Sequence, residues 1–559
     1  MLASHWCCVL PNDGAQMHDF NQSEYQILRP LPQHPNVVEM FGMAEDHVRV
    51  ITPDVGGGFG PKNQVYPEEL VIPAVARLLG RPIKWAEDRR EHFLTTTQER
   101  DQVWDMAAAV DADGRLLGVK GTLIHDAGAY LPWGIIMPYI SATTLPGPYK
   151  LPAYRIAVTV AFTNLVPTTP LRGAGRPQAV FAMERLMDAV ARETGLDPAE
   201  VRRRNFIQAS DMPYDMGLTY RDGAPVMYDT GDYPEAQAQA LAKAGYDSFP
   251  ERQQAALAEG RHIGIGIGNY VEGTGLGPFE GATVRILTNG RIAIYTGAAA
   301  AGQAHRTTLA QICADELSVD VSDIDVVGGD TGLMPRGAGT YASRITVNAG
   351  SSVRTASAEL RGKAIALAAA KFDVLPEDLE LRYGAVHIKG EQGDSISFAE
   401  LAKMTSGMPG YALPKGVKPD LEASGYFTPP QATYSNGSHV AEVEVDAETG
   451  QVTILKYTVV HDCGTVINPM LVDGQVQGGV AHGVGNALLE RMVFDDDANP
   501  LTTTFAEYLL PTAELVPNVE ILHLETPTPN NPLGVKGAGE GGTGPPGLQR
   551  KAGHSGDGR

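Results

Sequence analysis

The sequence contains very little cysteine, and this limits the metal sites that the chain can form by itself. Its 559 residues include only four cysteines, at positions 7, 8, 313 and 463, and no two of them are spaced as CxxC. The first two are adjacent, and the other two lie 150 positions apart. Such spacing is not typical of a disulfide framework, a zinc site or an iron–sulfur cluster. Any metal must therefore be carried by a cofactor.

Long apolar runs and an excess of basic residues are also lacking. No run approaches the ~20 apolar residues that a bilayer-spanning helix needs, and the N-terminus lacks the basic start and apolar core of a signal peptide. The 66 acidic residues outnumber the 44 basic ones, and the formal net charge of −22 disfavours contact with nucleic acid or anionic membranes. We expect a cytoplasmic protein that binds no nucleic acid and has no membrane span.

The periodicity of apolar residues predicts an α+β fold. Turn signals at Asp113-Gly114, Asn289-Gly290 and Thr449-Gly450 indicate three antiparallel hairpins, over 103–129, 282–295 and 440–460. A further short strand is predicted at His47–Ile51. Helical periodicity and end signals predict helices over 67–79, 177–194, 307–317, 347–372 and 472–492, with another starting at Asp197-Pro198.

A chain of this length exceeds one hydrophobic core, and we expect several domains. The best internal boundary is the charged, polar stretch 247–261, which precedes GIGIG at 264–268. We therefore predict an unassigned segment over 1–36, a first domain over 37–246, a linker over 247–261, a second domain over 262–546 and a disordered tail over 547–559.

Glycine is the compositional outlier, with 63 residues. That is about 11%, against an average near 7%. Glycines cluster in the loops 56–60, 171–177, 273–277 and 302–305, and again in 534–543, which reads GVKGAGEGGT. The last loop surrounds Glu540 with five glycines, so the backbone can bring its carboxylate close to a bulky ligand. Two interpretations remain: an acid or base aimed at a ligand, or a flexible tail with an incidental glutamate.

Two other glycine-rich stretches require comment. The loop 56–62 lies between a predicted strand and a helix, as phosphate-binding loops do, but Pro61 occupies a position where those motifs require glycine. Five glycines, at 474, 478, 479, 483 and 485, lie within the predicted helix 472–492. Each costs about 0.5–1 kcal/mol relative to alanine, so close approach of a cofactor or another helix is expected there.

Seven motifs occur together in order: ITPDVGGGFGPK, PLRGAGRPQ, GTGLGPFEGA, GQAHRTTLAQ, GTYASR, HDCGTVINPMLVDGQVQGG and GVKGAGEGGT. Together they resemble the molybdenum-binding subunit of the xanthine dehydrogenase and aldehyde oxidase family, in particular its carbon-monoxide-dehydrogenase-like large chains. The resemblance covers about His47 to Thr543. It implies two large molybdopterin-binding domains of mixed and antiparallel sheets with packed helices.

The resemblance also implies oxidative hydroxylation on a molybdenum atom that is held by the pterin rather than by protein ligands. Glu540 matches the general base that takes a proton from the metal-bound hydroxyl while hydride passes to sulfur. Burial in a dry pocket is expected to raise the proton affinity of such a carboxylate. Arg172 matches the arginine that orients the substrate, and Gln33 matches the glutamine that bonds a molybdenum ligand.

The remaining site residues implied by the resemblance are cofactor contacts. Phe59 and Gly60 match the loop beside the metal, while Gln303, Ser343 and Gln475 match contacts to the pterin and its phosphate. The expected cofactor-binding residues are Gly57, Gly58, Phe59, Gly60, Gly302, Gln303, His305, Ala342, Ser343 and Gln475. The cofactor is expected to be Mo-molybdopterin in its cytosine dinucleotide form.

The family relationship implies partners, because this chain has no cysteine pattern for electron transfer. We expect a [2Fe-2S] subunit and an FAD subunit in a dimer of heterotrimers. Carbon-monoxide-oxidising members carry a cysteine in the loop beside the arginine, and residues 166–171 contain none. Purine-oxidising members carry an aromatic residue at the position of Ala174. The expected substrate is therefore an aldehyde or an N-heterocycle.

Two departures from the family pattern leave alternatives open. Residues 1–36 do not resemble the family's N-terminal hammerhead domain, which we expect to be absent, and GPPGLQRKAGHSGDGR replaces the helix that follows GGT in the family. The chain is thus expected to be truncated at both ends. A non-catalytic remnant of the subunit is the first alternative, and a phosphate- or nucleotide-binding protein without redox activity is the second.

Overall fold

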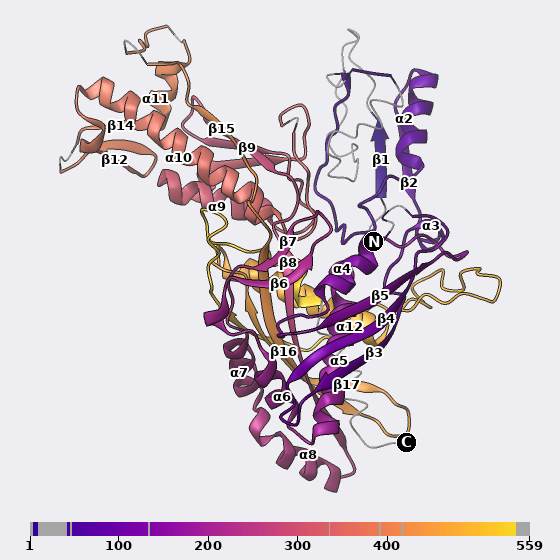
Figure 1. Cartoon of the computed structure of the whole chain (residues 1–559). Helices are drawn as coiled ribbons and strands as arrows, with labels where there is room; N and C mark the ends of the chain where they lie inside the picture. The colour runs from indigo at the N-terminus through magenta and orange to yellow at the C-terminus, as the bar shows by residue number, and fades with distance from the viewer. Residues whose placement is uncertain are drawn as a thin grey trace.

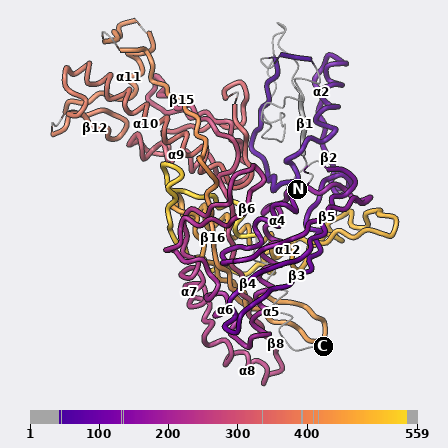
Figure 2. The backbone as a smooth tube through the Cα atoms, viewed as in Figure 1, coloured from indigo at the N-terminus to yellow at the C-terminus, as the bar shows by residue number. Residues whose placement is uncertain are grey.

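The computed structural model describes residues 4–8, 42–44, 47–131, 133, 135–334, 336–390, 393–407, 409–414 and 417–543. The expected contact Gln33 and the expected tail 547–559 lie outside the described residues, as does most of segment 1–36. Figures 1 and 2 show three regions: α9–α11 with β9 and β15 at the upper left, α2 with β2 at the upper right, and α5–α8 below.

The first part of the chain forms a three-stranded sheet with helices packed against it. Its strands are β3 (Gln102–Val110), β4 (Leu116–Asp126) and β5 (Tyr154–Ala161); β4 pairs antiparallel with β3 and parallel with β5. Preceding this sheet, β1 (Ser4–Cys8) pairs with β2 (Ile83–Glu87), and helices α2 (Glu68–Leu79) and α3 (Arg89–Thr95) flank β2 in sequence.

Helices α4 (Ile136–Thr144), α5 (Arg176–Thr194) and α6 (Pro198–Asn205) follow, and then the hairpin β6 (Tyr214–Thr219) and β7 (Pro225–Tyr228). Buried α5 residues such as Met183 and Met187 share one hydrophobic core with Leu116, and that core also includes Val271 and Tyr434. Residues from both sides of the stretch 247–261 therefore pack together. That stretch contains helix α8 (Phe249–Ala258), preceded by α7 (Tyr233–Ala244).

The second part contains two four-stranded sheets. The first has the order β18-β17-β16-β8, with β8 (His262–Thr274), β16 (Thr433–Val445), β17 (Val452–Asp462) and β18 (Val519–Leu524). Helix α7 packs on β16 and β17. Helix α12 (Pro469–Leu488) packs its valines against β17, in a core with Tyr457 and Val459.

The second sheet has the order β11-β10-β9-β15 and lies under two long helices. Its strands are β9 (Glu280–Ile286), β10 (Ile292–Thr296), β11 (Ile324–Gly328) and β15 (Glu422–Phe427). Helices α9 (His305–Leu317) and α10 (Ile345–Phe372) cover it through a shared core (Figure 1). A small sheet of β12 (Leu379–Arg382), β13 (Ala385–Ile388) and β14 (Ser395–Ser397) adjoins α11 (Phe398–Thr405).

The α+β prediction is confirmed, as are the three hairpins and the predicted helices, whose ends differ by only a few residues. The strand predicted at His47–Ile51 is wrong. Only Ile51 forms an isolated bridge, with Asp330, because this segment is bound by a loop rather than by a neighbouring strand. Arg49 pairs with the Asp330 carboxylate, and the backbone N–H of Val50 donates to the Thr331 hydroxyl at 2.9 Å.

The described residues were compared with two requirements, those of a membrane-spanning helix and those of a metal site made of protein side chains. Within the described ranges, no helix combines the length and apolar character that crossing a membrane requires. The same residues contain no group of three or more His, Cys, Asp or Glu side chains that could hold a metal ion.

Buried neutral histidines make the stability of this fold depend on pH. His461 on β17 is fully buried, and desolvation lowers its pKa to about 3, while burial of His305 lowers its pKa to about 4. Below about pH 6.5 the histidines of the unfolded chain bind protons, whereas these buried histidines of the native protein do not. Stability is therefore lost as the pH falls from about 6.5 toward these lowered values.

We expect thermal unfolding measured from pH 6.5 to pH 5 to show a falling melting temperature, with each such histidine contributing up to roughly 1.4 kcal/mol per pH unit. His461→Gln keeps a hydrogen-bond acceptor for Tyr270, whose hydroxyl lies 2.6 Å from His461 Nδ1, but cannot titrate. It should reduce the slope, whereas His262→Gln at an exposed position should not. Equal slopes for all three proteins would contradict the argument.

Candidate functional site

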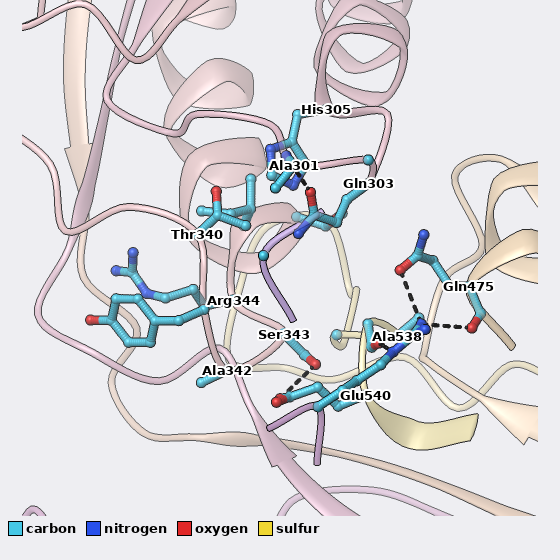
Figure 3. A pocket seen from close by; sticks show the side chains of 18 of the residues that line it. Ala301, Gln303, His305, Thr340, Ala342, Ser343, Arg344, Gln475, Ala538 and Glu540 are labelled. Atoms are coloured by element: carbon cyan, nitrogen blue, oxygen red, sulfur yellow. Dashed lines mark hydrogen bonds between the residues drawn. The ribbon is translucent and has the colours of Figure 1, made fainter. Parts of the chain in front are cut away.

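A cavity of about 430 Å³ lies where five loops meet, four of which contain glycine. These loops come from distant parts of the sequence: 56–60, 170–174, 301–303, 341–344 and 535–540. Of the residues expected at the site, the following line the cavity: Gly58, Phe59, Gly60, Arg172, Gly302, Gln303, His305, Ala342, Ser343, Gln475 and Glu540. Figure 3 shows several of them around the same space. Gly57 is not among the lining residues.

Glu540 occupies the end of this cavity and is held from two sides. Its Oε1 accepts a hydrogen bond from the backbone N–H of Gly173 at 3.2 Å, and its Oε2 lies 3.1 Å from the Ser343 hydroxyl (Figure 3). The guanidinium of Arg176 lies 3.6 Å from Oε2. The carboxylate is thus oriented by groups from two segments of the chain, 171–177 and 341–344, and the flexible-tail interpretation of GVKGAGEGGT does not describe its position.

The expectation that burial leaves Glu540 with a raised proton affinity is wrong in this structure. Burial does raise its pKa, but the charge of Arg176 and the hydrogen bonds to the carboxylate outweigh that effect. The pKa of Glu540 therefore lies below its ordinary value. The carboxylate is ionised at neutral pH, which is the state a proton acceptor needs.

Arg172 connects the glycine loop 534–543 to helix α12. Its Nε donates to the carbonyl of Gly539 at 2.6 Å, and its Nη2 donates to the carbonyl of Gln475 at 2.8 Å. Its guanidinium also lies 5.8 Å from the ring centre of Phe59, within the range of a cation–π contact. One side chain therefore fixes the relative positions of three cavity walls.

Two glycines of α12 are explained by close contacts with other parts of the protein. A Cβ atom at Gly479 would lie 2.7 Å from Gly542 Cα, and one at Gly478 would lie 3.2 Å from Arg172 Nη1. The turn that follows Glu540, at Gly541–Thr543, packs directly on the helix. The close neighbour in this structure is the loop 534–543 rather than the cofactor or second helix expected from the sequence.

The loop before α9 offers polar groups to the cavity. Ala304 takes a left-handed conformation at φ 59°, and the side chain of Gln303 turns back to accept from the Ala301 N–H at 2.7 Å. Helix α9 begins at His305, so its positive end is directed toward this loop. His305 Nδ1 is buried and has no hydrogen-bond partner among the described residues. Donors and an unsatisfied polar atom at one wall suit a polar, anionic ligand.

Sequence reasoning did not assign a role to several residues that the fold brings to Glu540. Arg176 was visible as the second arginine of LRGAGRP, and Glu272 as an acid within the apolar run of β8. Glu99 and Arg100 support the arginine loop from behind: Glu99 accepts from the Leu171 N–H at 2.5 Å, and Arg100 donates to the Arg172 carbonyl at 2.6 Å. A charged residue within an otherwise apolar or small-residue stretch was the available signal.

Comparison with known proteins identifies the family. Two models described as molybdopterin cofactor-binding domains match residues 26–206 and 239–517. The crystal structure of quinoline 2-oxidoreductase from Pseudomonas putida 86 superposes with a TM-score of 0.86 and 36% identity, over 94% of this chain and 68% of that chain. The chain belongs to the molybdenum-binding large subunits of the xanthine dehydrogenase and aldehyde oxidase family.

Two characterised relatives of this molybdenum-binding subunit show the same pattern of coverage. The 6-hydroxypseudooxynicotine dehydrogenase complex subunit gamma of Paenarthrobacter nicotinovorans is 37% identical over 90% of this chain. The carbon monoxide dehydrogenase large chain of Hydrogenophaga pseudoflava is 34% identical over 91% of it. The chain spans 63% and 65% of the lengths of these two relatives.

The cavity of this molybdenum-binding subunit fits a molybdopterin cofactor. The α9 end supplies N–H groups and the unpartnered His305 nitrogen, which suit the polar pterin and its phosphate. Gly537 brings the loop so close that a Cβ there would lie 1.9 Å from the Ser343 carbonyl oxygen. The loops therefore pack tightly against each other, and the cavity lies beside Glu540.

Substitution of single glycines in α12 tests how closely the helix supports the glycine loop 534–543. Gly479→Ala should push Gly542 away and lower stability by roughly 1–3 kcal/mol, because the added methyl meets fixed backbone. Gly474→Ala, in the same helix, meets nothing within 4 Å and should raise stability by up to about 1 kcal/mol. Denaturant unfolding of both variants is the measurement. Equal effects would show that α12 does not support the loop closely.

Proposed function

We propose that this chain is the catalytic large subunit of a molybdenum hydroxylase that inserts a water-derived oxygen into an N-heteroaromatic substrate. The observation that carries the proposal is the placement of an ionised Glu540 at the end of the cavity, with Arg172 and Phe59 beside it. When bound, the molybdenum cofactor supplies the oxidising centre and the oxygen for this chemistry.

Glu540 is proposed to act as the general base. Its Oε1 and Oε2 each accept one hydrogen bond, from Gly173 and Ser343, and this leaves lone pairs to take a proton from a group in the cavity. Arg172 holds the carbonyls on either side of the site and presents positive charge near the Phe59 ring, where it can stabilise negative charge that develops on the substrate.

Other residues that line the cavity are proposed to bind the cofactor. Gln303, His305, Ala342 and Gln475 offer amide, imidazole and backbone groups along the cavity. The cytosine dinucleotide form of molybdopterin stays part of this proposal. The proposed role of Gln33 and the proposed division into domains at 247–261 also stay predictions.

The substrate class is chosen from the two that the sequence left open. Quinoline and hydroxypseudooxynicotine, which two relatives name, both contain a pyridine-type ring. The loop 166–171 lacks a cysteine, which argues against carbon monoxide. An N-heteroaromatic ring offers the electron-poor carbon that hydroxylation requires. The electrons are proposed to pass to [2Fe-2S] and FAD partner subunits, in a dimer of heterotrimers located in the cytoplasm.

Metal and pterin analysis tests the proposal as a whole. The chain should be expressed with its [2Fe-2S] and FAD partner subunits in a molybdate-replete culture, and the purified complex should retain molybdenum and pterin in equal amounts. The reason is that the cavity walls offer polar groups that suit the cofactor. A folded complex that retains neither would contradict the proposal, and tight nucleotide binding by a molybdenum-free preparation would instead favour the phosphate-binding alternative.

A substitution at Glu540 tests its role as the base. Glu540→Gln keeps the shape of the side chain but cannot accept a proton, so we expect kcat with quinoline as the test substrate to fall by about 10²–10⁴-fold. Molybdenum and pterin contents should stay at the wild-type level. Glu448→Gln, at an exposed hairpin turn, is the control and should leave kcat unchanged. Full activity of Glu540→Gln would refute the assignment, whereas an inactive wild-type complex would favour the non-catalytic alternative.

A further inference from the structure

A second carboxyl group, that of Glu272, lies directly behind Glu540. Glu272 is near the end of β8, and its side chain is only 2% exposed. Its Oε1 is 3.2 Å from the Ser343 hydroxyl oxygen, and Glu540 Oε2 is 3.1 Å from the same oxygen. The hydroxyl of Ser343 thus lies between two carboxyl groups, and both are at hydrogen-bonding distance.

The number of hydrogens decides what this arrangement can be. A serine hydroxyl has one hydrogen to donate, and an ionised carboxylate can only accept. If both glutamates were ionised, one of the two short contacts to Ser343 would join two acceptors. The two carboxyl groups also hydrogen-bond each other, which again requires a proton on one of them. Both contacts to Ser343 are satisfied when the protonated carboxyl group donates to the Ser343 oxygen. The bridge therefore requires one proton on the pair.

The surrounding charges indicate which glutamate holds that proton. The charged and titratable groups around the pair are Arg176 of α5, Arg172 of the arginine loop and Tyr270 of β8. The guanidinium of Arg176 is 3.6 Å from Glu540 and 3.8 Å from Glu272, but only Glu540 also accepts a backbone N–H, from Gly173. Arg176 is the cation in ion-pair contact with both groups, and it cannot balance two adjacent buried carboxylates, so the less supported one is neutral.

We propose that Glu272 is a positioning residue that is held as a neutral carboxylic acid and donates to Ser343, so that the Ser343 hydroxyl donates to an ionised Glu540. In this arrangement Glu272 fixes the direction of the Ser343 hydrogen. Glu540 then keeps one oxygen on Gly173 and one on Ser343, with its remaining lone pairs directed to the cavity. This inference rests on the proposed role of Glu540 as the base and adds the group that orients it.

The directions of the two pKa values agree with this assignment. Burial, followed by the neighbouring charge of Glu540, raises the pKa of Glu272 well above its ordinary value despite Arg176. The pKa of Glu540 lies below its ordinary value for the reasons given above. Two carboxyl groups that share a site in this way separate in proton affinity.

Infrared spectroscopy of the cofactor-free full chain tests the protonation state without any turnover. At pH 7 the wild-type protein should show the carbonyl stretch of a buried carboxylic acid, and Glu272→Gln should lose one such band while its carboxylate bands stay unchanged. Glu442→Gln is the matched control: it removes a buried glutamate of β16 that is paired with Arg252, so it should lose a carboxylate band instead. A Glu272→Gln spectrum that loses only carboxylate intensity overturns the proposal.

Kinetics of the reconstituted complex tests the positioning role. Glu272→Ala should lower kcat by about 10-fold or more with little change in KM, because Glu540 is no longer oriented. Glu272→Gln, whose amide can donate to Ser343, should recover most of this loss. It should also leave the acidic limb of the pH profile of kcat/KM in place, whereas removal of an ionised Glu272 would lower that apparent pKa by roughly one unit or more.

The outcomes separate the two proposals. An inactive wild-type complex whose cofactor-free chain still shows the band assigned to Glu272 would refute the proposed function and leave the protonated pair intact. An active wild-type complex in which Glu272→Gln changes no carboxylic acid band, or shifts the acidic limb downward, would refute only the role of Glu272. If Glu272→Gln and Glu272→Ala lower kcat equally, the side chain has no donor role and the proposal also fails.

Discussion

The site depends on the packing of one glycine loop, 534–543, against three other parts of the chain. Gly537 lies against the Ser343 backbone, Gly542 lies against Gly479 of α12, and the Gly539 carbonyl accepts from Arg172. A side chain at Gly537 or Gly479 would collide with fixed backbone. Glu540, carried by the same loop, is therefore placed by backbone contacts that its own side chain does not make.

This constraint explains why so many glycines occur in a protein of otherwise ordinary composition. The loops that form the small cavity come from distant stretches of the sequence, although α5 shares a hydrophobic core with β8 and β16. Such loops can approach each other closely only where side chains are missing. The cost of glycine within α12 is thus offset by the contact that it permits with the turn at Gly541–Thr543.

Electrostatics then determines the chemical state of the loop's carboxylate. Desolvation alone would raise the pKa of Glu540, but Arg176 and the hydrogen bonds to the carboxylate outweigh that effect and keep it ionised. Arg172 is the arginine that the family motif assigns to the substrate. In the structure it donates mainly to the backbone carbonyls of Gly539 and Gln475. The two arginines of LRGAGRP therefore divide two tasks: Arg172 holds the walls together, and Arg176 sets the charge balance of the base.

The sequence alone determined the secondary structure where local signals were strong. Asp-Gly, Asn-Gly and Thr-Gly turns marked the hairpins, and Gly195 marked the end of α5, because these residues control φ and ψ within their own segment. Motif order was enough to identify the family and to select Glu540 and Arg172. The strand predicted at His47–Ile51 failed because its partner, the loop containing Asp330, lies 281 residues away from Arg49.

Only the tertiary structure decided that Glu540 is ionised and that Glu272 stands behind it. Both follow from distances between residues such as Arg176, Ser343 and Glu540, which are far apart in sequence and are brought together only by packing.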